Sequence, residues 1–119
     1  MTVITRAAAA PQSLAGLAPL PLQQGRAAEA AAFHQVLQQL RAAGTDKAAR
    51  TEALRMNRRL WQAVLVALAD PESPLAFPLR QGLATLGLAV LREQDRHQPD
   101  LAFLIAINQQ ILGGLAAYH

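Results

Sequence analysis

The sequence predicts an all-α protein, a small four-helix bundle preceded by a flexible N-terminal arm. Hydrophobic residues make up 52% of the 119 residues, and Ala and Leu supply most of them, whereas β-branched and aromatic residues are few. Ala and Leu lose little side-chain freedom in a helix, so this composition favours helix over strand. Four segments repeat their apolar residues at helical spacing, with short connectors between them. A chain of this length forms one domain.

Residues 1–24 form the predicted flexible arm, and residues 25–119 form the predicted bundle domain. The arm has no sustained helical or alternating period. Pro11, Pro19 and Pro21 each remove a backbone donor that a helix would need.

The first helix is predicted over residues 26–43, and Gly44 is expected to end it because glycine is the usual residue of a left-handed cap. Thr45 or Asp46 can cap a second helix that runs to Ala69. Both helices have an apolar stripe. The stripes are Phe33, Val36, Leu37 and Leu40 in the first helix, and Ala53, Leu54, Leu60, Trp61, Val64, Leu65 and Leu68 in the second.

Residues 70–74 contain two prolines and are expected to break the chain. A third helix is predicted over residues 75–93, with glycines at positions 82 and 87 that would permit a close approach between helices. Its inward row is predicted to be Leu79, Leu83, Leu86 and Val90.

The fourth helix is predicted over residues 99–116, because Pro99 suits the first turn of a helix. Gly113 and Gly114 are expected to form a C-terminal cap. One apolar stripe about 120° wide is predicted at 100° per residue. Its members are Leu101, Leu104, Ile105, Ile111, Leu112 and Leu115.

Composition and length exclude several classes of protein. Cysteine is absent, so disulfides, thiol nucleophiles and thiolate metal sites are impossible. No apolar run approaches the roughly 18 residues that a membrane-spanning helix needs. Pro11 and Gly16 interrupt the apolar part of any signal peptide. We therefore expect a cytoplasmic protein without a membrane span.

The charge of the chain is unevenly distributed. Residues 1–60 carry eight basic and three acidic side chains, whereas residues 61–119 carry three and five. This asymmetry is compatible with an acidic protein partner or with RNA, and it does not decide between them. Direct RNA binding would favour a denser basic stripe with stacking aromatic residues, so it is only weakly supported.

Two asparagines lie at the centre of predicted apolar faces, Asn57 in the second helix and Asn108 in the fourth. A buried carboxamide without hydrogen bonds costs roughly 1–3 kcal/mol, so both must find partners. They can satisfy each other or a helix end and thereby set the register of the bundle. The alternative is that one of them lines a groove for a partner.

Arginines and a tryptophan surround Asn57 in the sequence. Arg55 and Arg59 fall opposite the apolar stripe, with Arg58 at its edge near Trp61. Such a charged face can simply be solvated, or it can dock carboxylates or phosphates, which guanidinium groups bind bidentately. Trp61 can pack in the core or serve as an interface anchor.

Enzyme signals are almost absent, and we expect neither catalysis nor a cofactor or metal. His34, His97 and His119 show no metal-ligand spacing, and Ser13 and Ser73 have no nucleophile motif around them. No glycine-rich phosphate loop occurs. These absences favour a protein that works by binding another protein.

Four segments resemble the FlaF family of flagellar biosynthesis regulators. Residues 57–61 (NRRLW) resemble the core motif of the family, and residues 68–75 resemble the connector that follows it. Residues 79–90 and 105–115 resemble its later helices, and Arg26 and Glu29 fit the start of its first long helix. The resemblance therefore covers nearly all of the predicted ordered chain, from residue 26 to residue 115. Departures occur where the family commonly has other residues, at Gly25, Ala89 and Gln109.

The resemblance implies a role in the production and export of flagellin. FlaF proteins are thought to bind flagellin in the cytoplasm as a secretion chaperone and to promote flagellin synthesis, opposing the translational repressor FlbT. Flagellin is therefore the expected partner, held in an apolar groove near the second and fourth helices and oriented by arginines. The candidate partner-binding residues are Asn57, Arg58, Arg59, Leu60, Trp61 and Asn108.

Two alternatives stay open at this point. The protein can act directly on flagellin mRNA as a post-transcriptional regulator, or its apolar stripes can be used in an obligate dimer. A linear fall of log affinity with log salt would indicate RNA binding. Light scattering over a range of concentrations would determine the oligomeric state, which the sequence leaves undetermined.

Overall fold

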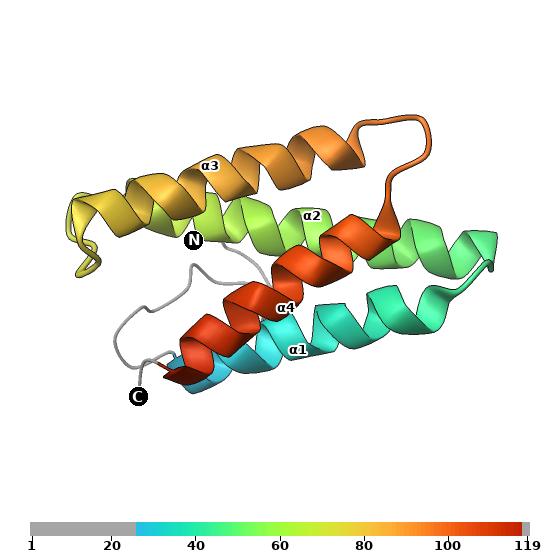
Figure 1. Cartoon of the computed structure of the whole chain (residues 1–119), viewed down its shortest axis with the longest axis horizontal. Coiled ribbons are helices and arrows are strands. Elements are labelled where there is room, and N and C mark those ends of the chain that lie inside the picture. The colour runs from blue at the N-terminus through green and yellow to red at the C-terminus, as the bar shows by residue number, and fades with distance from the viewer. Residues whose placement is uncertain (1–25, 118–119) are drawn as a thin grey trace.

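The computed structural model of the chain describes residues 26–117, and the side chains of residues 28–114; the predicted arm at residues 1–24 lies outside them. The described chain forms four helices, α1 (Arg26–Ala43), α2 (Lys47–Ala69), α3 (Phe77–Gln94) and α4 (Leu101–Ala117). Successive helices run in opposite directions, so α1 and α3 begin at the same end of the molecule (Figure 1). The predicted all-α four-helix bundle is confirmed.

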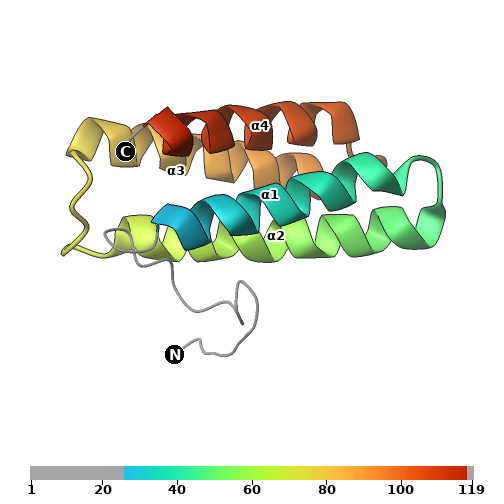
Figure 2. The same cartoon turned by 90° about the horizontal axis from the view of Figure 1, so that it is seen from below.

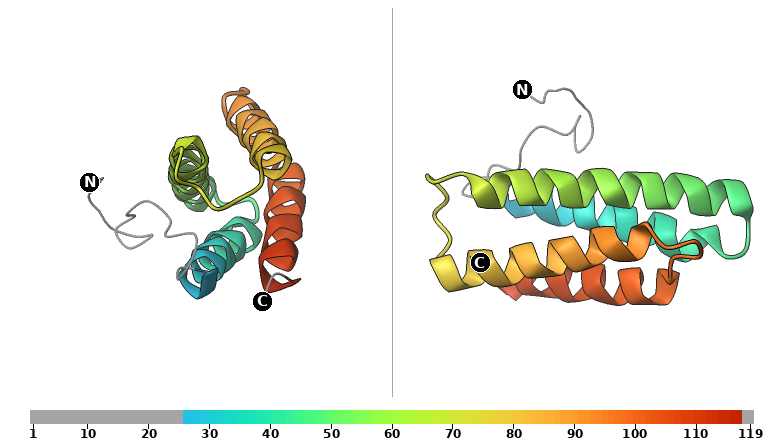
Figure 3. Two further views of the ribbon diagram at one scale, coloured as in Figure 1. Left: turned by 90° about the vertical axis from the view of Figure 1, so that its left-hand side faces the viewer. Right: turned by 90° about the horizontal axis from the view of Figure 1, so that it is seen from above.

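The four helices lie at the corners of a square in an end view (Figure 3). α1 and α2 form one side of the bundle, and α3 and α4 lie across from them (Figure 2). α1 packs against α2 and α4, and α2 packs against α3. α3 and α4 diverge towards the beginning of α3 (Figure 1), so these two helices do not pack closely along their length.

The first connector forms as predicted. Gly44 has a φ of +54°, the left-handed conformation in which a side chain is strained, and α1 ends before it. Asp46 is the residue that caps α2, because its Oδ2 accepts a hydrogen bond from the Ala49 N–H at 2.8 Å. Thr45 precedes the cap.

The later helices begin two residues after the predicted positions. α3 begins at Phe77 because Pro78 fits its first turn, where no backbone donor is needed. α4 begins at Leu101, and Asp100 rather than Pro99 sets its start: the Asp100 Oδ1 accepts from the Phe103 N–H at 3.1 Å.

Two predictions about glycines were wrong. Gly113 and Gly114 lie inside α4, which continues to Ala117, so they do not form a C-terminal cap. Apolar residues around them sustain the helical period despite the low helix propensity of glycine. A Cβ added at Gly82 would meet nothing within 4 Å, so this glycine does not permit a close approach.

The core is built mostly by α1 and α2. The predicted stripe of α1 is fully buried, and α2 buries Ala53, Leu60, Trp61, Val64 and Leu68 of its stripe. The predicted row of α3 is fully buried only at Val90, and the stripe of α4 only at Leu104. The other members with described side chains are half-buried; Leu115 falls outside the described side chains. Apolar surface of α3 and α4 is thus left partly open.

Candidate functional site

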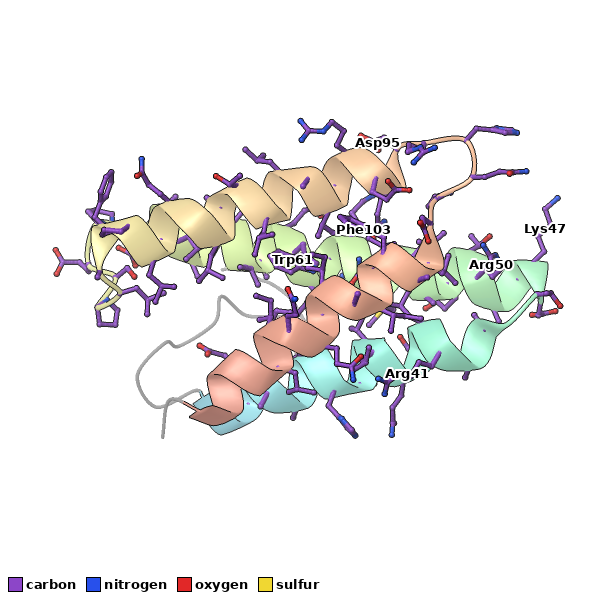
Figure 4. The ribbon with its side chains drawn as sticks, viewed as in Figure 1. Arg41, Lys47, Arg50, Trp61, Asp95 and Phe103 are labelled. Atoms are coloured by element: carbon purple, nitrogen blue, oxygen red, sulfur yellow. The ribbon has the colours of Figure 1, made fainter. Side chains whose placement is uncertain are left out.

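The six sequence-predicted residues divide into an interior group and a surface group. Four of them have no exposed surface: Asn57, Leu60, Trp61 and Asn108. Asn57 and Trp61 of α2 meet Asn108 of α4, and Trp61 lies in the centre of the bundle (Figure 4). Arg58 and Arg59 are half-buried at the surface of α2. The structure therefore brings the four uncharged residues together and keeps the two arginines outside.

A continuous series of hydrogen bonds connects α2, α3 and α4 through the interior. The Trp61 Nε1 donates to the Asn108 Oδ1 at 2.9 Å, and the Asn108 Nδ2 donates to the Asn57 Oδ1 at 2.7 Å. The Asn57 Nδ2 donates to the Gln94 Oε1 at 2.6 Å, and the Gln94 Nε2 donates to the main-chain oxygen of Leu54 at 2.9 Å. We call these four side chains (Trp61, Asn108, Asn57 and Gln94) the amide chain.

The amide chain explains how two asparagines are tolerated in an apolar interior. Each carboxamide in it both donates and accepts, so none is left without a partner. The first of the two sequence interpretations, that the asparagines satisfy each other, agrees with the Asn108–Asn57 hydrogen bond. A partner would reach these side chains only if the helices separated.

The Trp61 ring is enclosed by three other helices. Its ring lies edge-on to Phe33 of α1, with centroids 5.7 Å apart and an interplanar angle of 87°. On the α3 side, a Cβ added at Gly87 would lie 3.2 Å from the Trp61 ring and 2.8 Å from the Leu65 Cδ2. Gly87 therefore permits the close packing of α3 on α2 that was predicted for it, and the core interpretation of Trp61 agrees with its burial.

Sequence reasoning missed Gln94. The predicted third helix ended at Glu93, which placed Gln94 in a polar connector. The helix includes Gln94, and the side chain continues the buried row of Gly87 and Val90 at spacings of three and four residues. That helical spacing was the available signal.

The two surface arginines have different surroundings. Arg58 pairs with Asp95 at 2.7 Å, and the two side chains are 36% and 70% exposed, so the pair ties α2 to the end of α3 with little effect on stability. Arg59 has no ion pair with a described carboxylate. Arg55 is bound by Glu52 in the same helix, and this hydrogen bond lowers the pKa of the Glu52 carboxyl. Arg59 is thus the most available of the three arginines.

The described residues contain no cluster of three or more His, Asp or Glu side chains arranged to hold a metal ion. Between residues 26 and 117, no helix combines the length and hydropathy that crossing a membrane requires. Large apolar side chains do reach the surface: Val66 is 62% exposed, Phe77 61%, Leu88 58% and Phe103 37%.

A family model described as "Flagellar protein FlaF" matches residues 16–115. The chain belongs to the FlaF family. The resemblance found in the sequence is thereby confirmed, and it extends ten residues further towards the N-terminus than the quoted motifs. No curated protein and no solved structure matches this FlaF chain. The family makes it a flagellar protein. The amide chain includes Asn57 of the NRRLW segment and Asn108 of the fourth helix, and both asparagines lie in segments that resemble the family.

Proposed function

We propose that this FlaF protein binds flagellin in the cytoplasm as a secretion chaperone and promotes flagellin synthesis and export. Membership of a flagellar family over residues 16–115 is the observation that carries the proposal. Flagellin segments that are amphipathic and unfolded before assembly need an apolar surface to cover them. The client loses conformational entropy when it becomes ordered, and this loss lowers its affinity for the chaperone. A moderate affinity suits a chaperone that must release its cargo.

The packing of the bundle supports binding on its outside. The interface predicted to hold a groove, between α2 and α4, is occupied by the hydrogen-bonded side chains of Asn57, Trp61 and Asn108. The half-buried rows of α3 and α4 and the exposed Phe77, Leu88 and Phe103 leave apolar surface for a client. A partner-binding role of Asn57, Trp61 and Asn108 therefore requires an opened bundle.

Pull-down of flagellin tests both the function and the role of the arginines. Wild-type protein should retain flagellin, and an Arg58→Ala/Arg59→Ala variant should retain clearly less if these side chains orient the client. Arg55→Ala is the matched control, since Arg55 is held by Glu52. Failure of the wild type to retain flagellin would overturn the proposed function; equal retention by the double variant would remove only the arginine pair.

The effect on synthesis is proposed to oppose FlbT. Flagellin produced by cells that lack this protein should be low when FlbT is present and should recover when FlbT is also removed. Flagellin that stays low in the double deletion would contradict this link.

Direct binding of flagellin mRNA is the second candidate. Lys47 and Arg50 lie towards the end of the bundle where α1 turns into α2, and Arg41 lies in the last turn of α1 (Figure 4). None of the three has an ion pair with a described carboxylate. A gel shift with flagellin mRNA that weakens linearly on a plot of log affinity against log salt would support this candidate. Absence of a shift at low salt would exclude it.

A further inference from the structure

α3 has a second apolar stripe, at the edge of the face that packs against the core. Its members are spaced by seven, four and three residues, so they line one face of a helix. Phe77 and Leu88 in this stripe are 61% and 58% exposed. We call the set the outer stripe, and it consists of Phe77, Ala84, Leu88 and Leu91.

Two members of the outer stripe, Ala84 and Leu91, are half-buried against the core, whereas Phe77 and Leu88 are exposed. The residues with which α3 packs on α2 are Gly87, Val90 and Gln94. At 100° per residue, they lie roughly 100° around the helix from the outer stripe. α2 is the helix against which α3 packs, and α4 diverges from it (Figure 1). Phe77 and Leu88 are therefore the open part of the outer stripe.

Two unpaired arginines flank the outer stripe. From Phe77 to Arg92, the only charged residues of α3 are Arg80 and Arg92, and neither has an ion pair with a described carboxylate. Arg80 lies over the Phe77 ring, 5.8 Å from its centroid, and donates to the main-chain oxygen of Asp70 at 3.3 Å. Its Nε is buried without a hydrogen-bond acceptor among the described residues. Twelve residues separate the two arginines, which is about 18 Å along a helix.

These charges select among the possible occupants. A second copy of the chain would place Arg80 and Arg92 opposite the same two cations, which is unfavourable. Residues 1–25 of this chain contain no acidic residue and one arginine, so they supply no carboxylate. The complementary occupant is a helix of another protein with an apolar face and carboxylates at its edge.

We infer that the outer stripe docks an amphipathic helix of flagellin, whose apolar side chains cover Leu88 and Phe77. Two carboxylates of that helix, about 18 Å or twelve residues apart, pair with Arg80 and Arg92. This inference rests on the proposed function, and it adds the binding surface and the charge pattern of the client.

Titration of monomeric flagellin into variants of the full chain tests the apolar part. Leu88→Glu should weaken the affinity about tenfold or more, because it removes an apolar contact and brings a carboxylate towards acidic groups. Val66→Glu is the matched control: Val66 is 62% exposed, on the face of α2 opposite its buried residues, and binding should change less than about twofold. Unchanged helical circular dichroism verifies that each variant is folded.

The charge pattern has its own test. Arg92→Gln should weaken flagellin binding and make the affinity less dependent on salt, because one ion pair at the rim is lost. Arg55→Gln, on α2, removes a charge of the same kind that is held by Glu52, and it should leave both quantities unchanged.

The outcomes separate the two proposals. If wild-type protein binds flagellin and Leu88→Glu binds it equally well, the outer stripe is not the binding surface, and the proposed function stands. If wild-type protein does not bind flagellin, both proposals fall. If the wild type self-associates and Leu88→Glu is monomeric in sedimentation velocity, a second copy covers the stripe and the inference is overturned.

Discussion

At the scale of single residues, the three buried carboxamides and the Trp61 indole form one series of hydrogen bonds. Trp61, Asn108, Asn57 and Gln94 each bond to the next, and the main-chain oxygen of Leu54 accepts the last hydrogen bond. Net hydrogen-bond energies are modest, but a buried group left without its partner loses the full cost of desolvation, about 1–3 kcal/mol. The residues in the middle of the series therefore affect stability more than those at its ends.

Asn108→Ala should lower the free energy of unfolding by about 3 kcal/mol. The substitution leaves the Trp61 N–H and the Asn57 Oδ1 without partners in a buried site. Urea unfolding followed by circular dichroism measures the change. Gln109→Ala, at the neighbouring exposed position, should stay within about 0.5 kcal/mol of the wild type. A loss for Asn108→Ala as small as that of the control would contradict the role of the amide chain.

The asparagines were predictable from sequence and their partners were not. Helical spacing placed Asn57 and Asn108 at the centres of apolar faces, and both are fully buried. Spacing along one helix contains no information about which residues face it from other helices. Helical spacing could have placed Gln94 on the buried row of its helix, but its hydrogen bonds to Asn57 and Leu54 appear only in three dimensions.

At the scale of the helices, local chemistry decides where each one begins. Asp46 and Asp100 accept hydrogen bonds from backbone N–H groups three residues later, and Pro78 lies in the first turn of α3. Each satisfies or removes a donor that has no partner within the helix. The two caps should therefore contribute to stability independently of the core.

The cap of α2 can be tested by comparing substitutions of Asp46 and of Thr45, the residue before it. Asp46→Ala should destabilise the protein by about 1 kcal/mol, because the Ala49 N–H loses its acceptor. Thr45→Ala should have a smaller effect, within about 0.5 kcal/mol. Thermal unfolding of the two variants measures the difference, and equal effects would show that the carboxylate does not act as a cap.

The packing of α3 on α2 can be tested with its two glycines. Gly82→Ala should stabilise the protein by about 0.5–1 kcal/mol, because alanine favours a helix and the added Cβ meets nothing within 4 Å. Gly87→Ala should instead destabilise it by about 1 kcal/mol, since its Cβ would lie 2.8 Å from Leu65 and 3.2 Å from Trp61. Chemical denaturation measures both, and an equal gain at the two sites would disprove the close approach.

The helices were predicted well in number and extent and less well at their starts. Gly44 marked the end of α1 because glycine is favoured in the left-handed cap that follows a helix. The prolines after Ala69 marked the end of α2 because proline removes a backbone donor that the helix would need. Asp100 was ambiguous, because an exposed aspartate next to a proline is equally typical of a solvated loop. Whether Gly82 or Gly87 faces a neighbour depends on packing that spacing within one helix does not determine.

At the scale of the whole molecule, stability is unevenly distributed. α2 packs against both α1 and α3 and contains seven buried residues, whereas α3 has none before Gly87. Regions with few buried contacts open most readily. The beginning of α3, which carries Phe77 and Arg80, is thus the part of the described bundle with the least support from the core.

Hydrogen exchange should show this difference directly. Amides in residues 80–86 of α3 should be protected at least about tenfold less than amides in the middle of α2, because opening them exposes little core. Mass spectrometry of peptides from the full chain measures the protection. Addition of flagellin should raise the protection of this segment if the outer stripe is occupied. Equal protection of α2 and α3 without flagellin would contradict the unequal burial.

The sequence did not predict which helices pack against each other. Each amphipathic stripe indicated a buried face, but a stripe does not state which helix covers it. The divergence of α3 from α4 and the exposure of Leu88 are properties of the assembled bundle. For this reason the binding groove was predicted between α2 and α4, although the space between these two helices is filled by buried side chains.

The hydrogen bonds of the amide chain also run in one direction, from a group that can only donate to a group that can only accept. An indole N–H cannot accept and a main-chain oxygen cannot donate, so the three carboxamides between them fit in a single orientation. Four antiparallel helices with apolar stripes can be arranged clockwise or anticlockwise around a common axis, and both arrangements bury nearly the same apolar area. Only one of these assemblies brings α3 to the side of α2 on which Leu54 and Trp61 lie. The polar interior thereby chooses the handedness of the bundle.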